Sequence, residues 1–588
     1  MDRAPNDRQW HVHLTTLAGV AVLVFVSLFV YSPALRGGIL WDDAAHFSGN
    51  PNMHGWRGLF EIWTSRSAFY FPLTLTTFWT LFQLFGTWTP PYHLVTLGMH
   101  IAGAILFWYL LMRLRVRGGW VAAMLFAIHP MQVESVAWLS ELKNTQSCVF
   151  FLLSLLALER GGFLEAEDHV PRVRFWQIAA MVLFVAAILS KTSTVMLPAV
   201  IVVLVWWRGH LKGWASIDWT VPFFLIALLA SGWTIWEQRH SSGASGFEWS
   251  GGPFYRLALA GHVAWFYPAK LVWPHPLIFV YPQWHIDTHT IRAWLPLIGG
   301  GLLLGTLWWM RQGIGRIGLA VTLLYLALVF PVLGLFNIYY MRYAFVADHF
   351  AYLATLPLFA CVGAALSYAG RIRAPLCGVI LAACCVAAWD HAHAFKSEEA
   401  LWRDTLDKNK GAWMVHNNLG ASLLNKGDLA GAVHHFEEAL RYNPRHYEAL
   451  SNYANLQMQQ GQIDDAIMLY RRALELRPDF PLILYNLGIA LDRKGDLAAA
   501  GEHFARALAY NPAFRPAQEQ LALVYERRGM YTDAAQAFYL ALGMRGMDVK
   551  TASEFLSNRA IELSAKGELE GAAEYRRAVE RKKIRTND

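Results

Sequence analysis

Residues 413–446 read WMVHNNLGASLLNKGDLAGAVHHFEEALRYNPRH, and residues 447–480 read YEALSNYANLQMQQGQIDDAIMLYRRALELRPDF. The pattern continues over residues 412–545 with a period of 34. It is carried by the glycines Gly427, Gly461, Gly495 and Gly529, the alanines Ala432, Ala466, Ala500 and Ala534, and the aromatic residues Phe436, Tyr470, Phe504 and Phe538. A fixed period of this length is typical of architectures in which each unit buries its apolar face against its neighbours. The segment therefore predicts an α-solenoid.

The repeat resembles the tetratricopeptide repeat (TPR), whose unit is a helix, a turn and a second helix. Pro444, Pro478 and Pro512 close the first three units. We expect four TPR repeats over residues 412–545, preceded by a connecting half-repeat over 391–411. Residues 546–588 are expected to form degenerate TPR or capping helices that end in a basic tail.

The first 390 residues have a different composition. They carry 24 Lys/Arg and 17 Asp/Glu, whereas residues 391–588 carry 26 of each, so the net charge of +7 belongs to the first part. Charged residues are thus about 11% of the first part and about 26% of the second, against about 25% in soluble proteins. This composition excludes an all-soluble enzyme, a disordered chain and a disulfide scaffold. The neutral second part does not suit nucleic-acid binding.

Residues 1–390 are expected to form a multi-pass membrane domain. A helix needs roughly 20 apolar residues to span a bilayer. Eleven apolar runs are candidates, at 15–35, 92–112, 118–132, 145–159, 175–190, 194–207, 219–236, 294–310, 317–336, 350–369 and 376–390. A further apolar stretch, 254–290, is interrupted by four prolines. The sequence therefore predicts an all-α protein with about eleven membrane helices followed by the solenoid.

Loop charges predict the orientation. Arginine and lysine cluster in short loops around Arg113, Arg160, Arg208, Arg311 and Arg371. The positive-inside rule puts all of these loops in the cytoplasm, together with the N-terminus, if 254–290 leaves and re-enters the same face. The repeats and the remaining loops are then extracytoplasmic. The chain has no Asn-x-Ser/Thr sequon, which favours a bacterial inner membrane with these parts in the periplasm.

Ionisable residues gather on the predicted extracytoplasmic side, where such groups are costly and usually functional. Asp42 and Asp43 follow the first apolar run, and this pair suits removal of a proton from an acceptor hydroxyl or the holding of a Mg or Mn ion. A helix-end cap or a solvated loop is the alternative. Glu134 is a candidate site carboxylate. His129 fits either a site residue or a structural histidine at the interface.

Cations on the same side suit a phosphate. Lys143, Lys191 and Arg342 are the candidates, and lysines that snorkel from helix ends look the same in a sequence. Glu141, Asp348 and His349 are further site candidates, although Asp348 also fits a helix N-cap.

One position of the repeats carries carboxamides 34 residues apart, at Asn418, Asn452, Asn486 and Gln520. A carboxamide donates and accepts hydrogen bonds, as a peptide backbone does. The row resembles the asparagine ladder of the nucleocytoplasmic O-linked N-acetylglucosamine transferase, which implies binding of an acceptor peptide. Polar packing between repeats is the alternative.

The whole chain resembles the transmembrane, TPR-containing O-mannosyltransferases and their bacterial relatives, which are GT-C glycosyltransferases. The resemblance rests on the order of short motifs: Trp41-Asp42-Asp43, Pro72-Leu73-Thr74, Tyr92-His93-Leu94-Val95, His129-Pro130 with Glu134, Ser190-Lys191 with Pro198, and Asp348 with Tyr352-Leu353. Two positions depart from the pattern, since His349 stands where many relatives have Arg and Phe71 precedes Pro72 where Arg is frequent.

The resemblance implies an inverting protein O-glycosyltransferase. Its donor would be a polyprenyl-phosphate monosaccharide, usually mannose, and its acceptor a Ser or Thr hydroxyl of a protein. One of Asp42 and Asp43 would be the general base, and the cations would stabilise the leaving phosphate. Two other functions stay open. One is a non-enzymatic TPR scaffold for envelope or secretion assembly, and the other is a GT-C transferase with a lipid or glycan acceptor.

Overall fold

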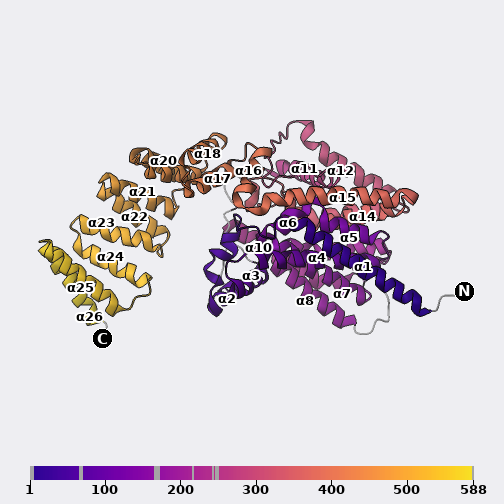
Figure 1. Cartoon of the computed structure of the whole chain (residues 1–588), viewed down its shortest axis with the longest axis horizontal. Coiled ribbons are helices and arrows are strands. Elements are labelled where there is room, and N and C mark those ends of the chain that lie inside the picture. The colour runs from indigo at the N-terminus through magenta and orange to yellow at the C-terminus, as the bar shows by residue number, and fades with distance from the viewer. Residues whose placement is uncertain are drawn as a thin grey trace. The chain divides into compact units, whose positions relative to one another are not determined.

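The computed structural model describes residues 5–64, 71–163, 173–214, 217–240, 244 and 251–585 (Figure 1). These residues form helices and loops, and none of them forms a strand. The chain divides into two compact units, Met1–Lys410 and Gly411–Asp588, which are called the membrane unit and the repeat unit below. The predicted fold class, an all-α membrane domain followed by an α-solenoid, is confirmed.

The membrane unit contains sixteen α-helices among its described residues. They are α1 (Pro5–Tyr31), α2 (Gly55–Thr64), α3 (Pro72–Phe85), α4 (Pro90–Arg113), α5 (Gly119–Ile128), α6 (Val133–Ala137), α7 (Leu142–Arg160), α8 (Val173–Ser190), α9 (Leu197–Arg208), α10 (Val221–His240), α11 (Pro253–Val272), α12 (Ile291–Trp309), α13 (Gly315–Val329), α14 (Thr355–Ser367), α15 (Arg373–Ala392) and α16 (Glu398–Lys408). Helix α4 packs against α5 and α7, α7 packs against α8, and α5 packs against α14.

Six helical segments in the described residues are long and apolar enough to cross a membrane. They are Pro90–Arg113, Val173–Ser190, Asp218–His240, Ile291–Trp309, Gly315–Val332 and Gly370–Lys396. Four shorter apolar helices coincide with other predicted spans, at Thr15–Tyr31, Gly119–Ile128, Thr192–Arg208 and Thr355–Ser367. The remaining predicted span lies in α7, whose first turn is polar. The structure thus confirms a helical membrane domain, whereas the predicted number of eleven crossings stays a prediction.

The proline-rich stretch 254–290 forms α11 and a long connection to α12. Near the start of α11, Arg256 donates to the backbone oxygen of Gly334, just after α13. At its other end, the Leu271 oxygen is hydrogen-bonded to Nε2 of His129, just after α5. In the predicted topology both partners lie on the extracytoplasmic side. Both ends of α11 thus contact residues on the same predicted side, as expected of a segment that leaves and re-enters the membrane unit on one side. Whether this segment crosses the membrane stays a prediction.

The arginine-bearing loops meet one another at the other ends of the helices. Arg113 pairs with Glu159 at 2.7 Å, which joins the ends of α4 and α7. Arg208 donates to the Leu114 oxygen at 3.3 Å, and Arg316 donates to the Trp206 oxygen at 2.7 Å. The loops after α4, α7, α9 and α12 thus share one end of the membrane unit.

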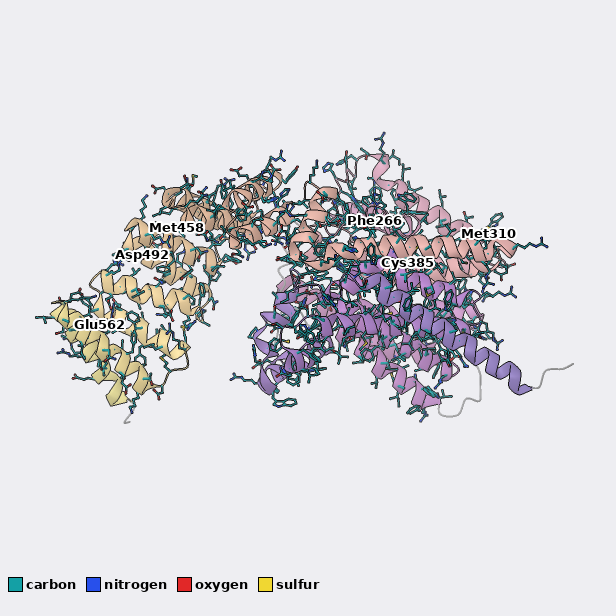
Figure 2. The ribbon with its side chains drawn as sticks, in the orientation of Figure 1. Phe266, Met310, Cys385, Met458, Asp492 and Glu562 are labelled. Carbon is teal, nitrogen blue, oxygen red and sulfur yellow. The ribbon has the colours of Figure 1, made fainter. Side chains whose placement is uncertain are left out.

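The described residues of the repeat unit form five helix pairs that follow one another in chain order, from orange to yellow in Figure 1. The pairs are α17 (Trp413–Asn425) with α18 (Leu429–Tyr442), α19 (Tyr447–Gln459) with α20 (Ile463–Leu476), α21 (Pro481–Lys494) with α22 (Leu497–Tyr510), α23 (Arg515–Arg527) with α24 (Tyr531–Met544), and α25 (Val549–Ala565) with α26 (Leu569–Arg585). Met458, Asp492 and Glu562 mark successive parts of this unit in Figure 2.

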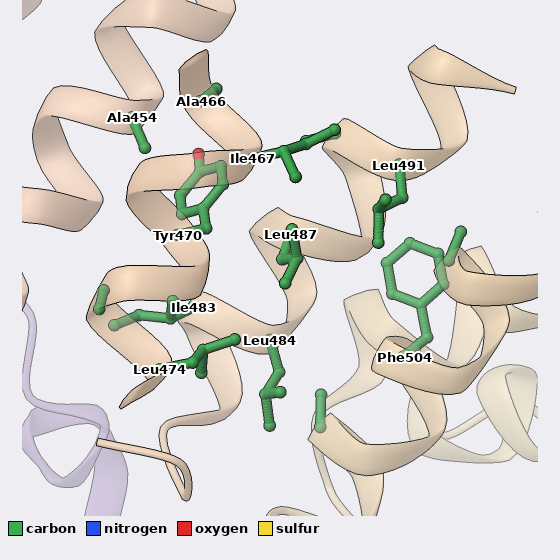
Figure 3. Close-up of a cluster of buried hydrophobic side chains, with 14 of the residues drawn as sticks. Ala454, Ala466, Ile467, Tyr470, Leu474, Ile483, Leu484, Leu487, Leu491 and Phe504 are labelled. Carbon is green, nitrogen blue, oxygen red and sulfur yellow. The ribbon is translucent and has the colours of Figure 1, made fainter. Parts of the chain in front are cut away.

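The period of the sequence follows from the geometry of one repeat. The turn glycines have positive φ, from 73° at Gly529 to 92° at Gly495, a conformation that a side chain disfavours. The repeated alanines and aromatic residues are buried between helices. Figure 3 shows part of this core, where Tyr470 and Phe504 lie among Ile467, Leu487 and Leu491.

Candidate functional site

The segment after α1 is packed against the rest of the membrane unit through Trp41. Trp41 has a φ of 35°, which is rare for a residue with a side chain and is found where the surroundings hold the backbone. Its ring stacks on Trp138 with centroids 5.9 Å apart, and it contacts Phe279 and Trp402 edge-on at 5.8 and 6.2 Å. These rings fix the backbone that carries the two aspartates.

Asp43 is fully buried and fully hydrogen-bonded. Its Oδ2 accepts from the Leu40 N–H at 2.9 Å, and its Oδ1 accepts from the N–H and the hydroxyl of Ser140 at 2.8 and 2.5 Å. Burial raises the pKa of Asp43 to about 7, although the hydrogen bonds from Ser140 and Leu40 lower it. Asp43 therefore ties the Trp41 segment to the loop between α6 and α7.

Asp42 has a different environment, although it is the next residue in the chain. It is half-buried, and no side-chain hydrogen bond to its carboxylate occurs among the described residues. Burial raises the pKa of Asp42 above its ordinary value, and the nearby charge of Lys143 offsets part of this effect. An accessible carboxylate with a raised pKa has the properties of a general base.

Glu141 joins two of the predicted phosphate ligands. Lys143 lies 2.9 Å from its Oε1 and Lys191 lies 3.1 Å from its Oε2. Glu141 is fully buried, whereas the two lysine side chains keep 15% and 17% of their exposure. The pair of lysines therefore carries one positive charge more than the glutamate between them, at a position close to Asp42.

Glu134 and His349 form a buried pair beside this cluster. His349 donates its backbone N–H to Oε2 of Glu134 at 3.0 Å, and its Nδ1 lies 2.8 Å from Oε1. The other ring nitrogen, Nε2, lies 4.0 Å from Glu141. Asn144 joins the two halves, since its amide donates to Glu141 at 2.6 Å and to the His349 oxygen at 2.9 Å. The structure thus brings Glu134, Glu141, Lys143, Lys191 and His349 into one network.

Besides the two aspartates, three predicted residues lie outside this network. Asp348 is buried and accepts from the Tyr281 hydroxyl at 2.9 Å, and burial raises its pKa well above the usual range. The Arg342 guanidinium lies over the rings of Tyr339 and Tyr343, and Tyr343 in turn contacts Trp41. His129 is hydrogen-bonded through both ring nitrogens to backbone, at Met131 and Leu271, as a structural histidine would be.

The aspartate pair does not fit a cation held by both carboxylates. Both oxygens of Asp43 already accept hydrogen bonds from the protein, and both oxygens of Glu141 face ammonium groups. In the described ranges, no three His, Cys, Asp or Glu side chains are grouped so that they could hold a metal ion. The carboxylates of Asp43 and Glu141 therefore do not fit the predicted Mg or Mn ion.

Sequence reasoning missed Ser140 and Asn144, which connect the site. Ser140 joins Asp43 to Nδ1 of His46, which lies 2.8 Å from its hydroxyl. Burial lowers the pKa of His46 to about 3, so this ring is neutral. A signal was available, because the polar run Asn144-Thr145-Gln146-Ser147 begins an otherwise apolar helix and is entirely buried.

The carboxamides of the repeat unit fall into two groups. Asn452 and Asn486 line one pocket, together with Asn455 and Arg493, whereas Asn418 and Gln520 do not line it. Asn452 donates to Oδ1 of Asn417 in the preceding repeat at 3.0 Å, and Asn486 donates to Oδ1 of Asn455 at 3.1 Å. The peptide-binding role stays a prediction. The amide nitrogens of Asn452 and Asn486 thus also form hydrogen bonds between repeats.

Comparisons with known proteins agree with the repeats and with the resemblance. The tetratricopeptide repeat family matches residues 417–481, 454–514 and 485–546. Solved structures similar to this chain include MamA, with 23% identity, a TM-score of 0.25 and coverage of 30% of this chain and 93% of that chain. They also include YrrB, described as a TPR protein with an unusual peptide-binding site, with 18% identity, a TM-score of 0.26 and coverage of 30% and 90%.

Similar curated proteins are named protein O-mannosyl-transferases. Tmtc1 of Drosophila melanogaster is 31% identical over 201 residues, which are 32% of this chain and 22% of that protein. TMTC4 of Mus musculus is 26% identical over 204 residues (29% and 27%), and TMTC1 of Homo sapiens is 28% identical over 177 residues (27% and 20%). The chain thus spans about a quarter of the length of the relatives it matches. Over the matched part, the predicted resemblance to the TPR-containing protein O-mannosyltransferases is confirmed.

Proposed function

We propose that the protein transfers a monosaccharide from a polyprenyl-phosphate donor to Ser or Thr hydroxyls of extracytoplasmic proteins. Mannose is the first sugar to test. One observation carries this proposal. The half-buried Asp42 carboxylate lies beside the Lys143–Glu141–Lys191 cluster, so a base and two ammonium groups are held close together. Transfer from a phosphate leaving group to a hydroxyl requires both of these groups.

Asp42 is the proposed general base. The acceptor oxygen attacks the anomeric carbon while its proton passes to the Asp42 carboxylate. The bond between the anomeric carbon and the phosphate oxygen breaks, and its electrons leave with the phosphate, so the anomeric configuration inverts. Asp43 does not take part in this step. It holds the backbone of Asp42 through its hydrogen bonds to Leu40 and Ser140.

Lys143 and Lys191 are the proposed phosphate ligands. Each ammonium group has three N–H donors, and the contact with Glu141 leaves donors for the donor phosphate. Negative charge grows on the phosphate as the sugar leaves, so these cations stabilise the transition state more than the ground state. Arg342 is assigned a less direct role, because its guanidinium lies on two tyrosine rings.

The proposed orientation puts the N-terminus in the cytoplasm and the site in the periplasm. The arginine loops share one end of the membrane unit, in agreement with the positive-inside rule. The proposed site consists of the loops that follow α1, α6 and α8 and of the first turn of α7. A lipid-linked donor would then remain in the bilayer while its sugar reaches this site. The repeat unit follows α15 and α16 and is proposed to hold the acceptor polypeptide on the same side.

The Asp42→Asn variant tests the proposal. Purified protein in detergent would be given mannosyl-phosphoryl-polyprenol and a Ser/Thr-containing peptide, with glycopeptide formation measured by mass spectrometry. Loss of a general base lowers the rate by about 10²–10⁴-fold. Asp390→Asn is the matched control, because Asp390 is an exposed aspartate at the end of α15.

We expect the Asp42 variant to lose transfer and to keep its unfolding temperature, and the Asp390 variant to keep both. Transfer by Asp42→Asn at the wild-type rate would exclude the proposed base. Failure of the wild-type protein to glycosylate any peptide, with unchanged glycopeptides in cells that lack the gene, would instead support the scaffold alternative.

A further inference from the structure

The repeat unit contains a pocket of about 440 Å³ that spans the first three repeats. Ligand pockets in proteins have volumes of about 300–1,000 Å³. Its polar lining consists of Asn425, Asn452, Asn455, Gln459, Asn486 and Arg493, and Tyr470 and apolar residues complete it. None of the eleven lining residues is an Asp or a Glu. The pocket thus combines neutral carboxamides with one positive charge.

Arg493 differs from the cations beside it. Lys494, the next residue, pairs with Asp464 at 2.6 Å. Arg527, one repeat later at the equivalent position, pairs with Asp492. In the part of the repeat unit that the structure describes, Arg493 forms no ion pair, and its one hydrogen bond goes to the Met458 oxygen at 3.5 Å. That distance is longer than a normal hydrogen bond of 2.7–3.2 Å. The guanidinium is therefore available to an anion.

The carboxamides next to Arg493 are held in fixed orientations. The Asn486 amide nitrogen donates to Oδ1 of Asn455, and the same oxygen accepts from the Tyr470 hydroxyl. Asn486 keeps its carbonyl oxygen and a second N–H for a ligand, and Asn455 keeps its amide nitrogen. An extended polypeptide presents N–H and C=O groups in alternation, so it can bind these groups along the row. A side chain of that polypeptide can then reach Arg493.

We propose that this pocket selects an extended acceptor segment with an acidic side chain, whose carboxylate is bound by Arg493. Charge complementarity carries the assignment, because the lining has one guanidinium and no carboxylate. Arginine binds carboxylates through two parallel hydrogen bonds, which gives direction as well as affinity. The inference rests on the proposed role of the repeats in holding acceptor polypeptides, and it adds the chemical class of the segment that they bind.

Peptide binding to the full chain tests this inference. The protein in detergent micelles would be titrated into two fluorescein-labelled ten-residue peptides of Gly, Ala and Ser, one with a central Glu and one with Gln at that position. A hydrogen bond to a charged group corresponds to roughly a tenfold or larger preference for the Glu peptide. The preference should fall as the salt concentration rises, because the guanidinium is exposed.

Arg493→Gln should reduce the ratio of the two affinities to about one. Arg493→Glu should bind a third peptide, with a central Lys, more tightly than the Glu peptide. Lys494→Gln is the matched control, and it should keep the ratio because Lys494 is paired with Asp464. Equal binding of the two peptides by the wild type, no binding of either, or a preference that survives Arg493→Gln would overturn the inference.

The Asp42→Asn variant separates this inference from the proposed function. If both hold, this variant binds the Glu peptide with the wild-type preference and transfers no sugar. If the transferase proposal fails and the inference holds, the wild type and the Asp42→Asn variant both prefer the Glu peptide, although neither transfers sugar.

Discussion

Replacement of Glu141 by Gln tests whether this buried carboxylate organises the site. Glu141 lies 2.9 Å from Lys143 and 3.1 Å from Lys191 and is fully buried. At about 3 Å and an effective dielectric constant of about 20, each attraction amounts to roughly 5 kcal/mol before desolvation is subtracted. Measurements on buried pairs show that removal of one partner costs about 3–5 kcal/mol, because the other charge stays buried without compensation.

We therefore expect Glu141→Gln to lower the stability of the membrane unit by about 3–5 kcal/mol. The matched control is Glu399→Gln on α16, where Glu399 lies 2.8 Å from Arg403 but the two side chains are 29% and 57% exposed. An exposed pair contributes only about 0.2–1 kcal/mol. Thermal unfolding in detergent, followed by tryptophan fluorescence, measures both variants under the same conditions.

The double variant Glu141→Gln/Lys191→Gln adds a second criterion. Removal of Lys191 takes away one of the uncompensated cations, so the double variant should be less destabilised than the sum of the two single variants. If Glu141→Gln unfolds within 1 kcal/mol of the Glu399→Gln control, or if the double-variant effects are additive, the reasoning about this cluster is refuted.

Three further outcomes are expected. Burial raises the pKa of Asp43 from its ordinary 3.8 to about 7. Its contribution to the free energy of unfolding is therefore most favourable below pH 3.8 and is lost as the pH rises toward 7. Asp43→Asn should flatten the pH dependence of unfolding between these two values, by up to about 4 kcal/mol. Burial alone would raise the pKa of Glu141, but the charges of His349, Lys143 and Lys191 lower it below the ordinary 4.5. The stabilisation by Glu141 is thus complete above pH 4.5 and is lost as the pH falls below that value. Glu141→Gln should not show this loss of stability at low pH. Gly495→Ala, at a φ of 92°, should cost about 1–2 kcal/mol, whereas Gly501→Ala within α22 should be neutral or stabilising, because an added Cβ there meets no atom closer than 3.4 Å; chemical denaturation followed by circular dichroism compares the two.

The repeat unit could be predicted almost completely from the sequence, because its structure is local. Each turn needs a residue with positive φ, and the glycines recur at that position every 34 residues. Each helix pair packs a small residue against an aromatic ring, as at Gly488, where an added Cβ would lie 2.6 Å from the ring of Phe504. Neighbouring segments of the chain make these contacts, so the period reveals them.

The site could be predicted only as a set of residues. Glu134 and His349 are 215 positions apart, and Asp43 and Ser140 are 97 positions apart. No periodic pattern connects such residues. The sequence also gives no reason to distinguish Asp42 from Asp43. The difference arises in the folded chain, where the Asp43 carboxylate is hydrogen-bonded to the distant Ser140, whereas that of Asp42 stays partly exposed.

The ring contact between Trp402 and Trp41 bears on how the protein can be divided. The apolar part of the chain ends near residue 390, and a truncated protein would naturally be designed to end at this boundary. Such a protein would lack α16 and its fully buried Trp402, so Trp41 and Phe279 would each lose a packing partner. Asn409, whose amide donates to the Val280 oxygen, would be lost as well. A chimera or truncation that is meant to retain the membrane unit should therefore extend through Lys410, and exchange of the repeats alone should begin at residue 411.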